Sequence, residues 1–600
     1  MCGFVGYIDN TKNKDKTIKK MNDKIKHRGP DSQGYYIDDY IALGFRRLSI
    51  IDLKNGDQPM YNIDKSIVIV FNGEIYNYKE IKKDLIKKKY KFKTNSDTEV
   101  LLNAYIEYKE KVLNKLRGMF SFVIYDKNKK EIFAARDFFG IKPFYYYKDE
   151  DVFMFGSEIK SFIENPNFKK DLNLEALKNY LTFQYSPGED TFFNNVKKLL
   201  PGHYLKYKNN KIEIKQYYDL KLKKENKSKE YYLKNLEKAL DSSIKAHKVS
   251  DVEVGSFLSS GVDSSFIATK SKINKTFTVG FENKNYSEID YAKDLSKKIK
   301  VENISKIISK EEFFKEFSKI QYHMDEPIAD PAAVALYFVS NIASKHLKVS
   351  LSGEGADEIF GGYKTYQEPF FFPSYYKIPF LIRKYIGKLA GLLPEKRGLN
   401  ILVRRSKRLE DRYVGNAFIF SEKEIKNILK YKSNTKFQDL TKNYYKDLED
   451  FDDVSKMQYI DLNFWLVGDI LLKADKMSMA NSLEVRVPFL DKEVFEIGKK
   501  IPTKYKVDNK ETKKIFREIS SKVLEDKVSK KEKLGFPVPI RLWLKEEDIY
   551  LKVKKEFENN KFFNEKEIIK LLDDHKLSKK DNSRKIWTLY TFLIWYKEFF

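Results

Sequence analysis

The sequence has almost no cysteine: in 600 residues the only one is Cys2. No disulfide can form within the chain, which excludes the disulfide-stapled secreted domains and favours a reducing compartment. The first ten residues, MCGFVGYIDN, have neither a basic start nor a long apolar stretch, so they do not resemble a secretory signal.

Long apolar runs are also missing. The most apolar stretches, such as PSYYKIPFLIRKYIGKLAGLL, are interrupted by Lys, Arg and Pro well short of the ~18 apolar residues of a membrane span. The six histidines form no metal-spaced pair on one helix, which favours structural roles for them. We therefore expect a soluble, cytoplasmic protein with no membrane partner.

What the chain does contain is ample material for globular folding. Hydrophobic residues make up 42% and aromatic residues 15%, and 600 residues allow about two to four domains. The net charge of +27 would fit nucleic acid, but the lysines alternate with Glu and Asp along the whole chain. That pattern is typical of solvated helix faces, so no nucleic-acid partner is expected.

Residues 1 to about 205 alternate short β-rich runs with turns, and two helical patterns interrupt them. This favours an α+β layered sandwich. A polar, lysine-rich segment follows, and we expect the first domain to cover 1–217 and the second 218–600.

In the second domain the sequence predicts helices that alternate with strands at 252–258, 276–281, 303–308 and 348–353. Strands separated by such helices indicate a parallel α/β sheet, whose ligands bind at the carboxyl ends of the strands. The small-residue loops 259–265 and 352–358 fall at such ends and should face one pocket. Beyond Gly362 the chain is predicted to be mostly helical.

The loop 257–265 (FLSSGVDSS) joins a predicted strand to a helix, for which Asp263 and the serines after it offer N-cap chemistry. Free N–H groups and the positive helix end there would cradle a phosphate. The loop is not a Walker motif, because no Gly-Lys-Ser/Thr follows. An ordinary strand-to-helix turn explains it equally well.

Cys2 is the most specific candidate for a catalytic residue. If Met1 is removed, the thiol sits beside a free α-amine of pKa ~8, so one residue holds both nucleophile and general base. From position alone, an incidental cysteine is as good an explanation.

Asn72-Gly73, after an apolar strand, could form an oxyanion hole, although Asn-Gly is often only a hairpin turn. Arg47 and Asp97 could clamp an α-carboxylate and an α-ammonium.

Several longer motifs then carry a resemblance. Cys2-Gly3, 27–31 (HRGPD), 47–52 (RLSIID), 72–77 (NGEIYN) and 96–99 (SDTE) resemble the glutaminase domain of class II amidotransferases, which is of the N-terminal-nucleophile type. The loop 258–265 and 351–358 (LSGEGADE) resemble an ATP-pyrophosphatase synthetase domain with a helical C-terminal part. In this order, and on through 486–491 (RVPFLD) to Lys513, the chain is similar to the glutamine-hydrolysing asparagine synthetases.

The resemblance implies roles for the first domain. Cys2 would be the nucleophile that forms a γ-glutamyl thioester and releases ammonia, with Asn72 and Gly73 as the oxyanion hole. The glutamine pocket would comprise Arg47, Leu48, Ser49, Ile50, Ile51, Asn72, Gly73, Glu74 and Asp97.

It also implies roles for the second domain, with ATP and Mg²⁺ as its cofactors. The ATP-binding residues would be Phe257, Leu258, Ser259, Ser260, Gly261, Asp263, Ser264, Val279, Ser352 and Gly353. Asp263 and Asp357 would hold Mg²⁺, because a hard cation prefers carboxylates and phosphate oxygens. Glu354 would influence the acyl-adenylate, and Lys513 would face the α-phosphate.

The implied reaction is ATP-dependent amidation of aspartate, with ammonia crossing a dry passage between the two sites of a homodimeric enzyme.

Two departures from the family pattern stand out. Ser260 replaces a common Gly, which predicts either φ below zero or modest strain. The segment 322–331 differs from the threonine-rich stretch of well-known members, so another carboxylate acceptor, such as a cell-wall precursor, stays open. A non-catalytic, nucleic-acid-binding or scaffold protein is the alternative from another class.

Overall fold

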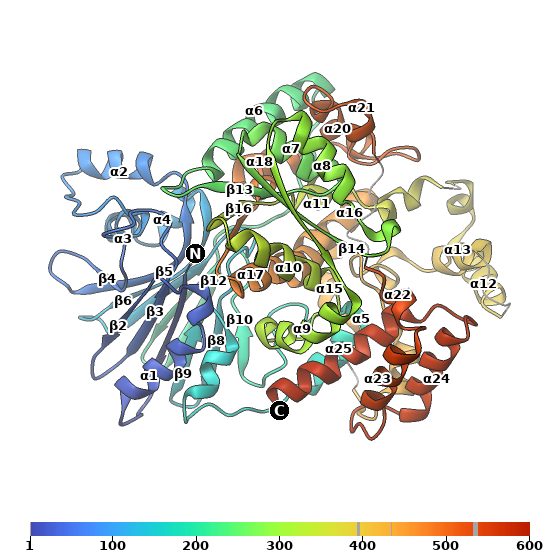
Figure 1. Ribbon diagram of the computed structural model, residues 1–600, viewed down its shortest axis with the longest axis horizontal. Helices are drawn as coiled ribbons and strands as arrows, with labels where there is room; N and C mark the ends of the chain where they lie inside the picture. The colour runs from blue at the N-terminus through green and yellow to red at the C-terminus, as the bar shows by residue number, and fades with distance from the viewer. Residues whose placement is uncertain (1, 372, 393–396, 434, 532–537) are drawn as a thin grey trace.

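The computed structural model describes residues 2–371, 373–392, 397–433, 435–531 and 538–600. Two stacked antiparallel sheets form one side of the molecule, and a parallel sheet surrounded by helices forms the other (Figure 1). This arrangement confirms the predicted α+β sandwich followed by an α/β domain with a helical C-terminal part. Met1, on whose removal a free amine at Cys2 depends, lies outside the described residues.

The sandwich consists of two six-stranded sheets. The first runs, in spatial order, β10 (Val196–Lys198), β8 (Tyr145–Asp149), β9 (Val152–Gly156), β1 (Gly3–Ile8), β3 (Ala42–Arg47) and β2 (Ser32–Ile37). The second runs β12 (Lys211–Gln216), β11 (His203–Lys208), β7 (Glu131–Arg136), β6 (Gly118–Asp126), β5 (Ile67–Ile75) and β4 (Met60–Tyr61). The helices of this half are α1 (Lys14–Asp23), η1 (Lys26–Arg28), α2 (Tyr78–Lys87), α3 (Asp97–Tyr108), η2 (Lys109–Lys111), α4 (Val112–Lys115), η3 (Ile159–Glu164) and α5 (Leu174–Phe183).

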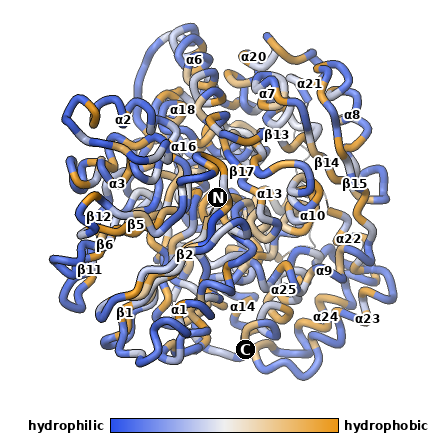
Figure 2. Tube along the Cα trace, turned by 60° about the vertical axis from the view of Figure 1, so that its left-hand side comes forward, coloured by the Kyte–Doolittle hydropathy of each residue, from blue (hydrophilic) through white to orange (hydrophobic). Residues whose placement is uncertain are grey.

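Alternate residues of the strands fill the space between the two sheets. Val68 and Val70 of β5 point into the same buried cluster as Val123 and Tyr125 of β6, as the period of two in a strand requires. Cys2, directly before β1, belongs to this cluster. Figure 2 shows apolar residues running along the strands and hydrophilic residues in the outer turns. The core therefore fixes the backbone on which Cys2 sits.

The second half is built on five parallel strands: β15 (Glu302–Ile308), β14 (Lys275–Phe281), β13 (Val254–Phe257), β16 (Val349–Leu351) and β17 (Glu484–Arg486), in that order. β17 was not expected, because the chain after Gly362 was predicted as helical; at three residues it is too short for a sequence pattern. The helices linked to the sheet are α6 (Lys229–His247), α7 (Val262–Ser271), η4 (Lys284–Tyr286), α8 (Ile289–Lys298), α9 (Lys310–Met324), α10 (Ala332–Ser344) and α11 (Ala356–Phe360).

The remainder is helical, as predicted. It comprises η5 (Lys364–Phe370), η6 (Pro373–Lys377), α12 (Phe380–Ala390), α13 (Arg397–Arg405), η7 (Leu409–Asp411), α14 (Glu422–Ile428), α15 (Phe437–Asp447), α16 (Asp453–Ile460), the π-helical η8 (Asp461–Leu471) and α17 (Leu472–Met479). It continues with η9 (Pro488–Leu490), α18 (Lys492–Gly498), α19 (Thr503–Lys506), α20 (Lys514–Ser520), α21 (Asp526–Ser529), α22 (Ile540–Trp543), α23 (Glu547–Phe557), α24 (Glu565–Lys576) and α25 (Ser583–Phe599). Within the described ranges, no helix has the length and apolar character to cross a membrane.

Buried ion pairs join the two halves. Arg28 Nη1 lies 2.9 Å from Glu158 Oε1 and 2.9 Å from Asp475 Oδ2, and all three side chains are almost inaccessible to solvent. Burying charges is costly unless they are paired and hydrogen-bonded, so this contact favours one fixed arrangement of sandwich and parallel sheet.

Candidate functional site

A small cavity of about 30 Å³ lies at one end of the sandwich. Its lining residues are Cys2, Arg47, Leu48, Ile50, Ile51, Gly56, Gln58, Phe71, Gly73, Glu74, Ser96, Asp97 and Thr98. Most of the predicted glutamine-binding residues thus meet at one place. Ser49 and Asn72 lie beside the cavity instead: the Ser49 N–H donates to Asp31 Oδ2 (2.8 Å), and Asn72 contacts Cys2.

The Cys2 thiol is buried at the start of β1. Burial raises its pKa, so the thiol is not ionised in advance and a base must take its proton during attack. The backbone nitrogen of Cys2 donates to Asn72 Oδ1 at 3.2 Å. The nitrogen that would become the α-amine is therefore held next to the thiol of the same residue.

Asn72 and Gly73 on β5 have the properties of an oxyanion hole. The Oδ1 of Asn72 is used by Cys2, whereas its buried Nδ2 has no hydrogen-bond partner among the described residues. A buried donor without a partner is costly, and a transient oxyanion would satisfy it. At Gly73 a Cβ atom would lie 2.1 Å from the carbonyl oxygen of Met119, so only glycine fits there.

The Arg47 guanidinium is already hydrogen-bonded to the loop that follows it, and is not fully available to bind a carboxylate. Its Nη2 donates to the carbonyl of Asp52 (2.7 Å), and its Nη1 donates to Asp57 Oδ1 (3.0 Å). A Cβ at Gly56 would lie 2.3 Å from Nη2, so glycine is needed for this packing. Arg47 therefore braces the loop that follows it as well as lining the cavity.

Asp97 is the first residue of α3, after Ser96, whose Oγ accepts a hydrogen bond from the Thr98 N–H. The Asp97 carboxylate accepts a hydrogen bond from the Ile75 N–H (3.0 Å). Burial raises the pKa of Asp97 to about 6. The carboxylate is thus ionised near neutral pH but loses its charge in mildly acidic solution.

A larger cavity of about 360 Å³ opens at the carboxyl ends of β13, β14 and β16. All ten predicted ATP-binding residues line it, together with Glu354, Asp357 and Lys513. The two loops that were expected to face one pocket do so, because β13 and β16 are neighbours in the parallel sheet.

Serine hydroxyls shape the loop after β13. Ser264 Oγ accepts from the Ser259 N–H (3.1 Å), and Ser259 Oγ accepts from the Gly261 N–H (3.1 Å). The expected capping role of Asp263 is wrong: the N-cap of α7 is Gly261, without a side-chain cap, and Asp263 lies in the first turn. The helix N-terminus thus opens toward the cavity.

Ser260 was the main departure from the family pattern. It is not among the described residues with positive φ, so the backbone takes the unstrained alternative. Its Oγ donates a hydrogen bond to Glu288 Oε1, directly before α8. The serine therefore adds a tie between the loop and α8 that glycine could not make. Glu288 lies too far along the chain for sequence reasoning to have paired it with Ser260.

Lys513 connects the two predicted metal ligands. Its Nζ lies 2.7 Å from Asp263 Oδ1 and 2.7 Å from Asp357 Oδ1. Burial opposes the charge of Lys513, but the attraction of the two carboxylates outweighs it and raises the pKa. A Cβ at Gly362 would lie 1.9 Å from Asp357 Oδ1 and 2.2 Å from Lys513 Cε, so glycine makes room for this cluster.

The donor set fits a magnesium ion. Asp263 and Asp357 both pair with the Lys513 ammonium at the cavity wall. Two carboxylates could hold a hard cation such as Mg²⁺ in the same way. Over the parts of the chain that the structure describes, there is no group of three or more His, Cys, Asp or Glu arranged for a metal. Phosphate oxygens would have to complete the coordination, which is the usual arrangement when magnesium accompanies a nucleotide.

Further residues complete the cavity wall, and sequence reasoning missed most of them. The additional polar and aromatic lining residues are Glu288, Asp330, Tyr363, Trp465, Lys473, Arg517 and Lys531. Lys473 pairs with Asp330 and, at 2.6 Å, with Asp469. Asp330 lies within the segment 322–331 that differs from the family pattern, so this difference was a signal in the sequence for this wall.

The loop of the small cavity is tied to the parallel-sheet half. The Asp251 N–H donates to the carbonyl of Ile50 (3.1 Å), and Asp251 Oδ2 accepts from the Asp52 N–H (2.8 Å). Asp251 lies three residues before β13, whose other end carries the serine loop. One short strand therefore links the two cavities.

Two family models match the chain. One, described as a glutamine amidotransferase domain, matches residues 1–218, and the other, described as asparagine synthase, matches residues 235–597.

Full-length relatives agree with these matches. The chain is 46% identical to asparagine synthetase [glutamine-hydrolyzing] 1 of Bacillus subtilis, over 99% of this chain and 96% of that protein. It is 37% identical to a putative asparagine synthetase [glutamine-hydrolyzing] of Mycobacterium tuberculosis, over 97% of this chain and 93% of that protein.

Proposed function

The chain belongs to the glutamine-hydrolysing asparagine synthetases, and we propose that it converts L-aspartate to L-asparagine with ammonia taken from glutamine. ATP is consumed and leaves as AMP and pyrophosphate, and glutamine leaves as glutamate. The observation that carries this proposal is the pair of cavities in one chain. One contains the only cysteine, and the other contains the serine loop and the Asp263–Lys513–Asp357 cluster.

In the small cavity, the Cys2 thiol attacks the amide carbonyl carbon of glutamine. Its proton passes to the α-amine of Cys2, which Asn72 Oδ1 positions. Asn72 Nδ2 and the Gly73 N–H then donate to the oxyanion. When the carbon–nitrogen bond breaks, the amine returns the proton to the leaving nitrogen and ammonia departs. Water hydrolyses the remaining thioester to glutamate.

The ends of glutamine are held by charge. The Asp97 carboxylate would accept the α-ammonium group, and Arg47, which lines the same cavity, would face the α-carboxylate. Recognition at both ends places the amide carbon against the thiol.

In the larger cavity, a side-chain carboxylate oxygen of aspartate attacks the α-phosphorus of ATP. The bond to the bridging oxygen breaks, and pyrophosphate leaves. Ammonia then attacks the carbonyl carbon of the mixed anhydride, loses a proton and displaces AMP. Lys513 and the α7 N-terminus face the phosphates and stabilise the developing negative charge.

Asp263 and Asp357 would hold Mg²⁺, which supplies further charge neutralisation on the pyrophosphate when it is bound. Lys513 keeps the two carboxylates together until then, because its ammonium lies between them. When ATP binds, the lysine can donate to its phosphates instead.

Aspartate is the favoured acceptor. The full-length relatives carry the name asparagine synthetase, and the wall formed by Asp330 and Lys473 offers one charge of each sign to an amino acid. No described contact favours a larger carboxylate, so the alternative acceptor receives no support.

Four further features belong to the proposal. We place the domain boundary between residues 217 and 218, just after β12 ends at Gln216. A cytoplasmic location is supported by the single cysteine, which must stay reduced to act. A homodimer and a dry ammonia passage follow from the family resemblance alone.

Glutamine labelled with nitrogen-15 in its amide group tests the function directly. With aspartate and ATP, the label should appear in asparagine, with one AMP and one pyrophosphate for each asparagine. AMP formation that does not depend on aspartate, or label that stays in free ammonia, would contradict the assignment.

A further inference from the structure

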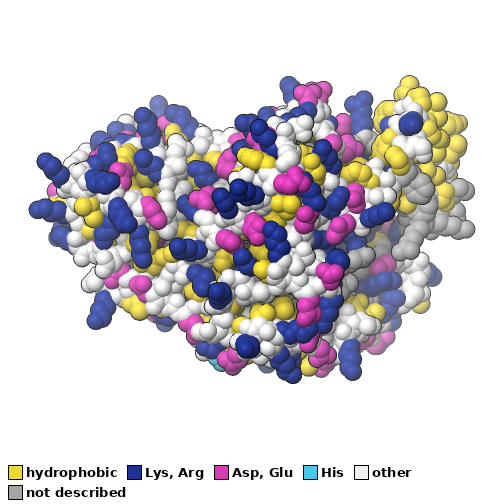
Figure 3. All heavy atoms as spheres, turned by 90° about the horizontal axis from the view of Figure 1, so that it is seen from above, with side chains coloured by type: hydrophobic (Ala, Val, Ile, Leu, Met, Phe, Trp, Pro, Cys, Tyr) yellow, Lys and Arg dark blue, Asp and Glu magenta, His cyan; other side chains and the backbone are white. Residues whose placement is uncertain are grey.

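One surface plays no part in either cavity. Helices α12 and α13 project from the end of the molecule that lies opposite the sandwich (Figure 1). In Figure 3 hydrophobic side chains gather densely at that same end, whereas elsewhere on this face they are scattered among charges. Exposed apolar patches of this kind mark interaction sites in soluble proteins.

The exposed apolar residues form one stripe along α12. Leu381, Tyr385 and Leu389 are spaced by four residues, which places them on a single face of α12, and Ile382 lies beside them. Leu392 lies in the turn directly after the helix. Leu381 and Leu392 are each 78% exposed, and Tyr385 is 65% exposed. We call these five residues the α12 face.

The opposite side of the helix already has its packing partner. Gly387 and Ala390 are buried, and a Cβ at Gly387 would lie 1.9 Å from Ser406 Oγ, so the chain segment after α13 approaches α12 there. Arg383 secures the same side by donating to the carbonyls of Ile378 (3.0 Å) and Arg405 (3.2 Å). The α12 face is therefore additional to the side that packs on the protein.

The charge around the stripe has one sign. Lys384 and Lys388 are exposed on α12 next to the apolar residues. The sequence from 373 to 392 contains four cations, Lys377, Arg383, Lys384 and Lys388, and no acidic residue. The α12 face thus combines apolar insertion with positive charge, as in helices that lie in a membrane interface.

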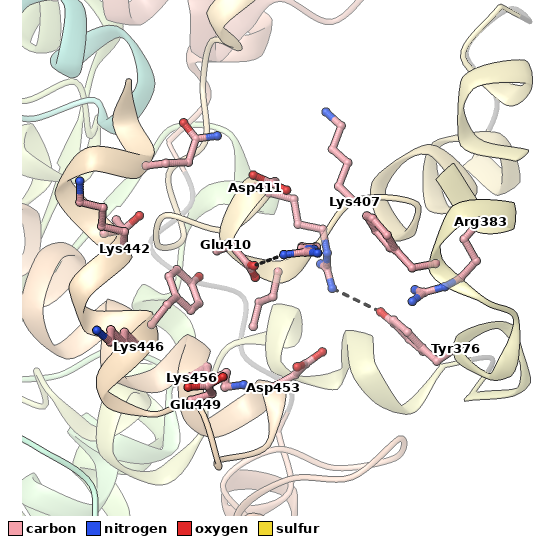
Figure 4. A pocket seen from close by; sticks show the side chains of 17 residues that line it. Tyr376, Arg383, Lys407, Glu410, Asp411, Lys442, Lys446, Glu449, Asp453 and Lys456 are labelled. Carbon is pink, nitrogen blue, oxygen red and sulfur yellow. Dashed lines mark hydrogen bonds and ion pairs between the residues drawn. The ribbon is translucent and has the colours of Figure 1, made fainter. Parts of the chain in front are cut away.

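Positively charged side chains also line the side of α12 that faces α15 and α16. A cavity of about 790 Å³ separates α12 from α15 and α16, and Figure 4 shows lysine and arginine side chains on both walls. Its charged lining residues are Arg383, Lys407, Arg408, Arg412, Lys442, Lys446 and Lys456 against Glu410, Asp411, Glu449 and Asp453. The buried Nε of Arg412 has no hydrogen-bond partner among the described residues, although Nη1 donates to Glu368 (2.6 Å). Anionic groups would be attracted to this side as well.

We propose that the α12 face docks on an anionic lipid surface, with the five apolar side chains entering the headgroup layer and Lys384 and Lys388 contacting the lipid phosphates. The association is peripheral and revises the expectation of no membrane partner. A second copy of the chain is disfavoured as the occupant, because its own α12 face would bring the same positive charge. Nucleic acid is disfavoured because a row of exposed leucines would gain nothing from a phosphate backbone.

Co-sedimentation of the full-length protein with vesicles tests the proposal. Binding should be detectable with phosphatidylglycerol vesicles, much weaker with phosphatidylcholine vesicles, and reduced by high salt. Leu381→Ser with Leu392→Ser should lower the partition onto phosphatidylglycerol vesicles by about tenfold or more. Lys384→Glu with Lys388→Glu should lower it by about tenfold. Asparagine formation in solution should stay the same in both double variants.

The matched control is Ile63→Ser with Leu577→Ser, since these residues are 72% and 62% exposed at other places on the surface. This control should bind vesicles like the unmodified protein. Absence of binding to phosphatidylglycerol, or equal loss in the control, overturns the proposal. A change of oligomeric state in the Leu381/Leu392 variant without lipid would also overturn it, by assigning the face to a protein contact.

Discussion

Arg486 Nη2 lies 3.4 Å from Glu74 Oε1, although Arg486 ends β17 of the parallel sheet and Glu74 lines the glutamine cavity on β5. Both side chains are buried. Burial and the nearby Glu484 raise the pKa of Glu74, and Arg486 opposes that shift. Arg486 also donates to the carbonyls of His247 (2.9 Å) and Val249 (2.6 Å), so it ties the glutamine cavity to the chain that leads into β13.

Replacing Arg486 should therefore damage glutamine use more than ammonia use. In Arg486→Lys the shorter, non-planar cation cannot keep both the ion pair with Glu74 and the hydrogen bonds to two carbonyls. Breaking a buried pair costs about 3–5 kcal/mol. We expect glutamine-dependent asparagine formation to fall well below the ammonia-dependent rate of the same variant. Thermal unfolding, measured in parallel, distinguishes a lost connection between the two cavities from a loss of folded protein.

Arg117→Lys is the control for this experiment. Arg117 also joins the two halves, through Asp491 Oδ2 at 2.8 Å, but it does not line the glutamine cavity. Equal losses of both activities in Arg486→Lys, or the same imbalance in Arg117→Lys, would refute a specific role for Arg486.

Asp97 predicts a pH dependence of glutamine binding. Its pKa of about 6 is raised by burial, so the carboxyl group is charged above that pH and neutral below it. The neutral form cannot attract the glutamine ammonium, and KM for glutamine should therefore rise as pH falls through about 6. Ammonia-dependent synthesis, measured over the same range, provides the reference.

Asp97→Asn tests the assignment because it keeps the shape and removes the charge. Its KM for glutamine should be high at every pH and should no longer change near pH 6. If the variant kept the pH profile of the unmodified enzyme, another group would be responsible.

Asn72→Ala should slow glutamine hydrolysis with little effect on glutamine affinity. The buried Nδ2 has no hydrogen-bond partner among the residues that the structure describes, so we expect its hydrogen bond to form only with the oxyanion. Loss of one such donor lowers kcat by about 10²–10³. A variant that changed KM alone would instead place Asn72 among the residues that bind glutamine in the ground state.

Removal of divalent cations should separate the two cavities. Chelation should stop AMP formation, because Asp263, Asp357 and pyrophosphate would lose the shared cation, and glutamine hydrolysis should continue. Lys513→Met should likewise abolish AMP formation while leaving glutamine hydrolysis intact. Loss of glutamine hydrolysis on chelation would show that the metal acts elsewhere.

Much of this arrangement could be predicted from local patterns. The alternation of helices and strands gave the parallel sheet, and the small-residue loops after β13 and β16 indicated one shared pocket at their carboxyl ends. The sequence suggests Cys2 as a nucleophile, Asn72 as part of an oxyanion hole and Asp97 as a clamp for an α-ammonium, and all three lie in or beside one cavity.

Contacts between distant segments could not be predicted in the same way. The bond of Ser260 to Glu288, the reach of Arg486 to Glu74 and the pairing of Lys473 with Asp330 each join residues whose spacing carries no helical or strand period. Arg47 shows the same limit: its sequence position suggested a free clamp, whereas the loop around Gly56 occupies much of its guanidinium.

In the proposed function, one chain makes ammonia at Cys2 and consumes it at the serine loop. The most direct test compares asparagine formation by Cys2→Ala and by unmodified protein, with glutamine or with ammonium as the nitrogen source. Cys2→Ala should form no asparagine from glutamine and should keep the ammonium-dependent rate of the unmodified protein. Loss of both activities in folded Cys2→Ala protein, or glutamine-dependent product that persists, would contradict it.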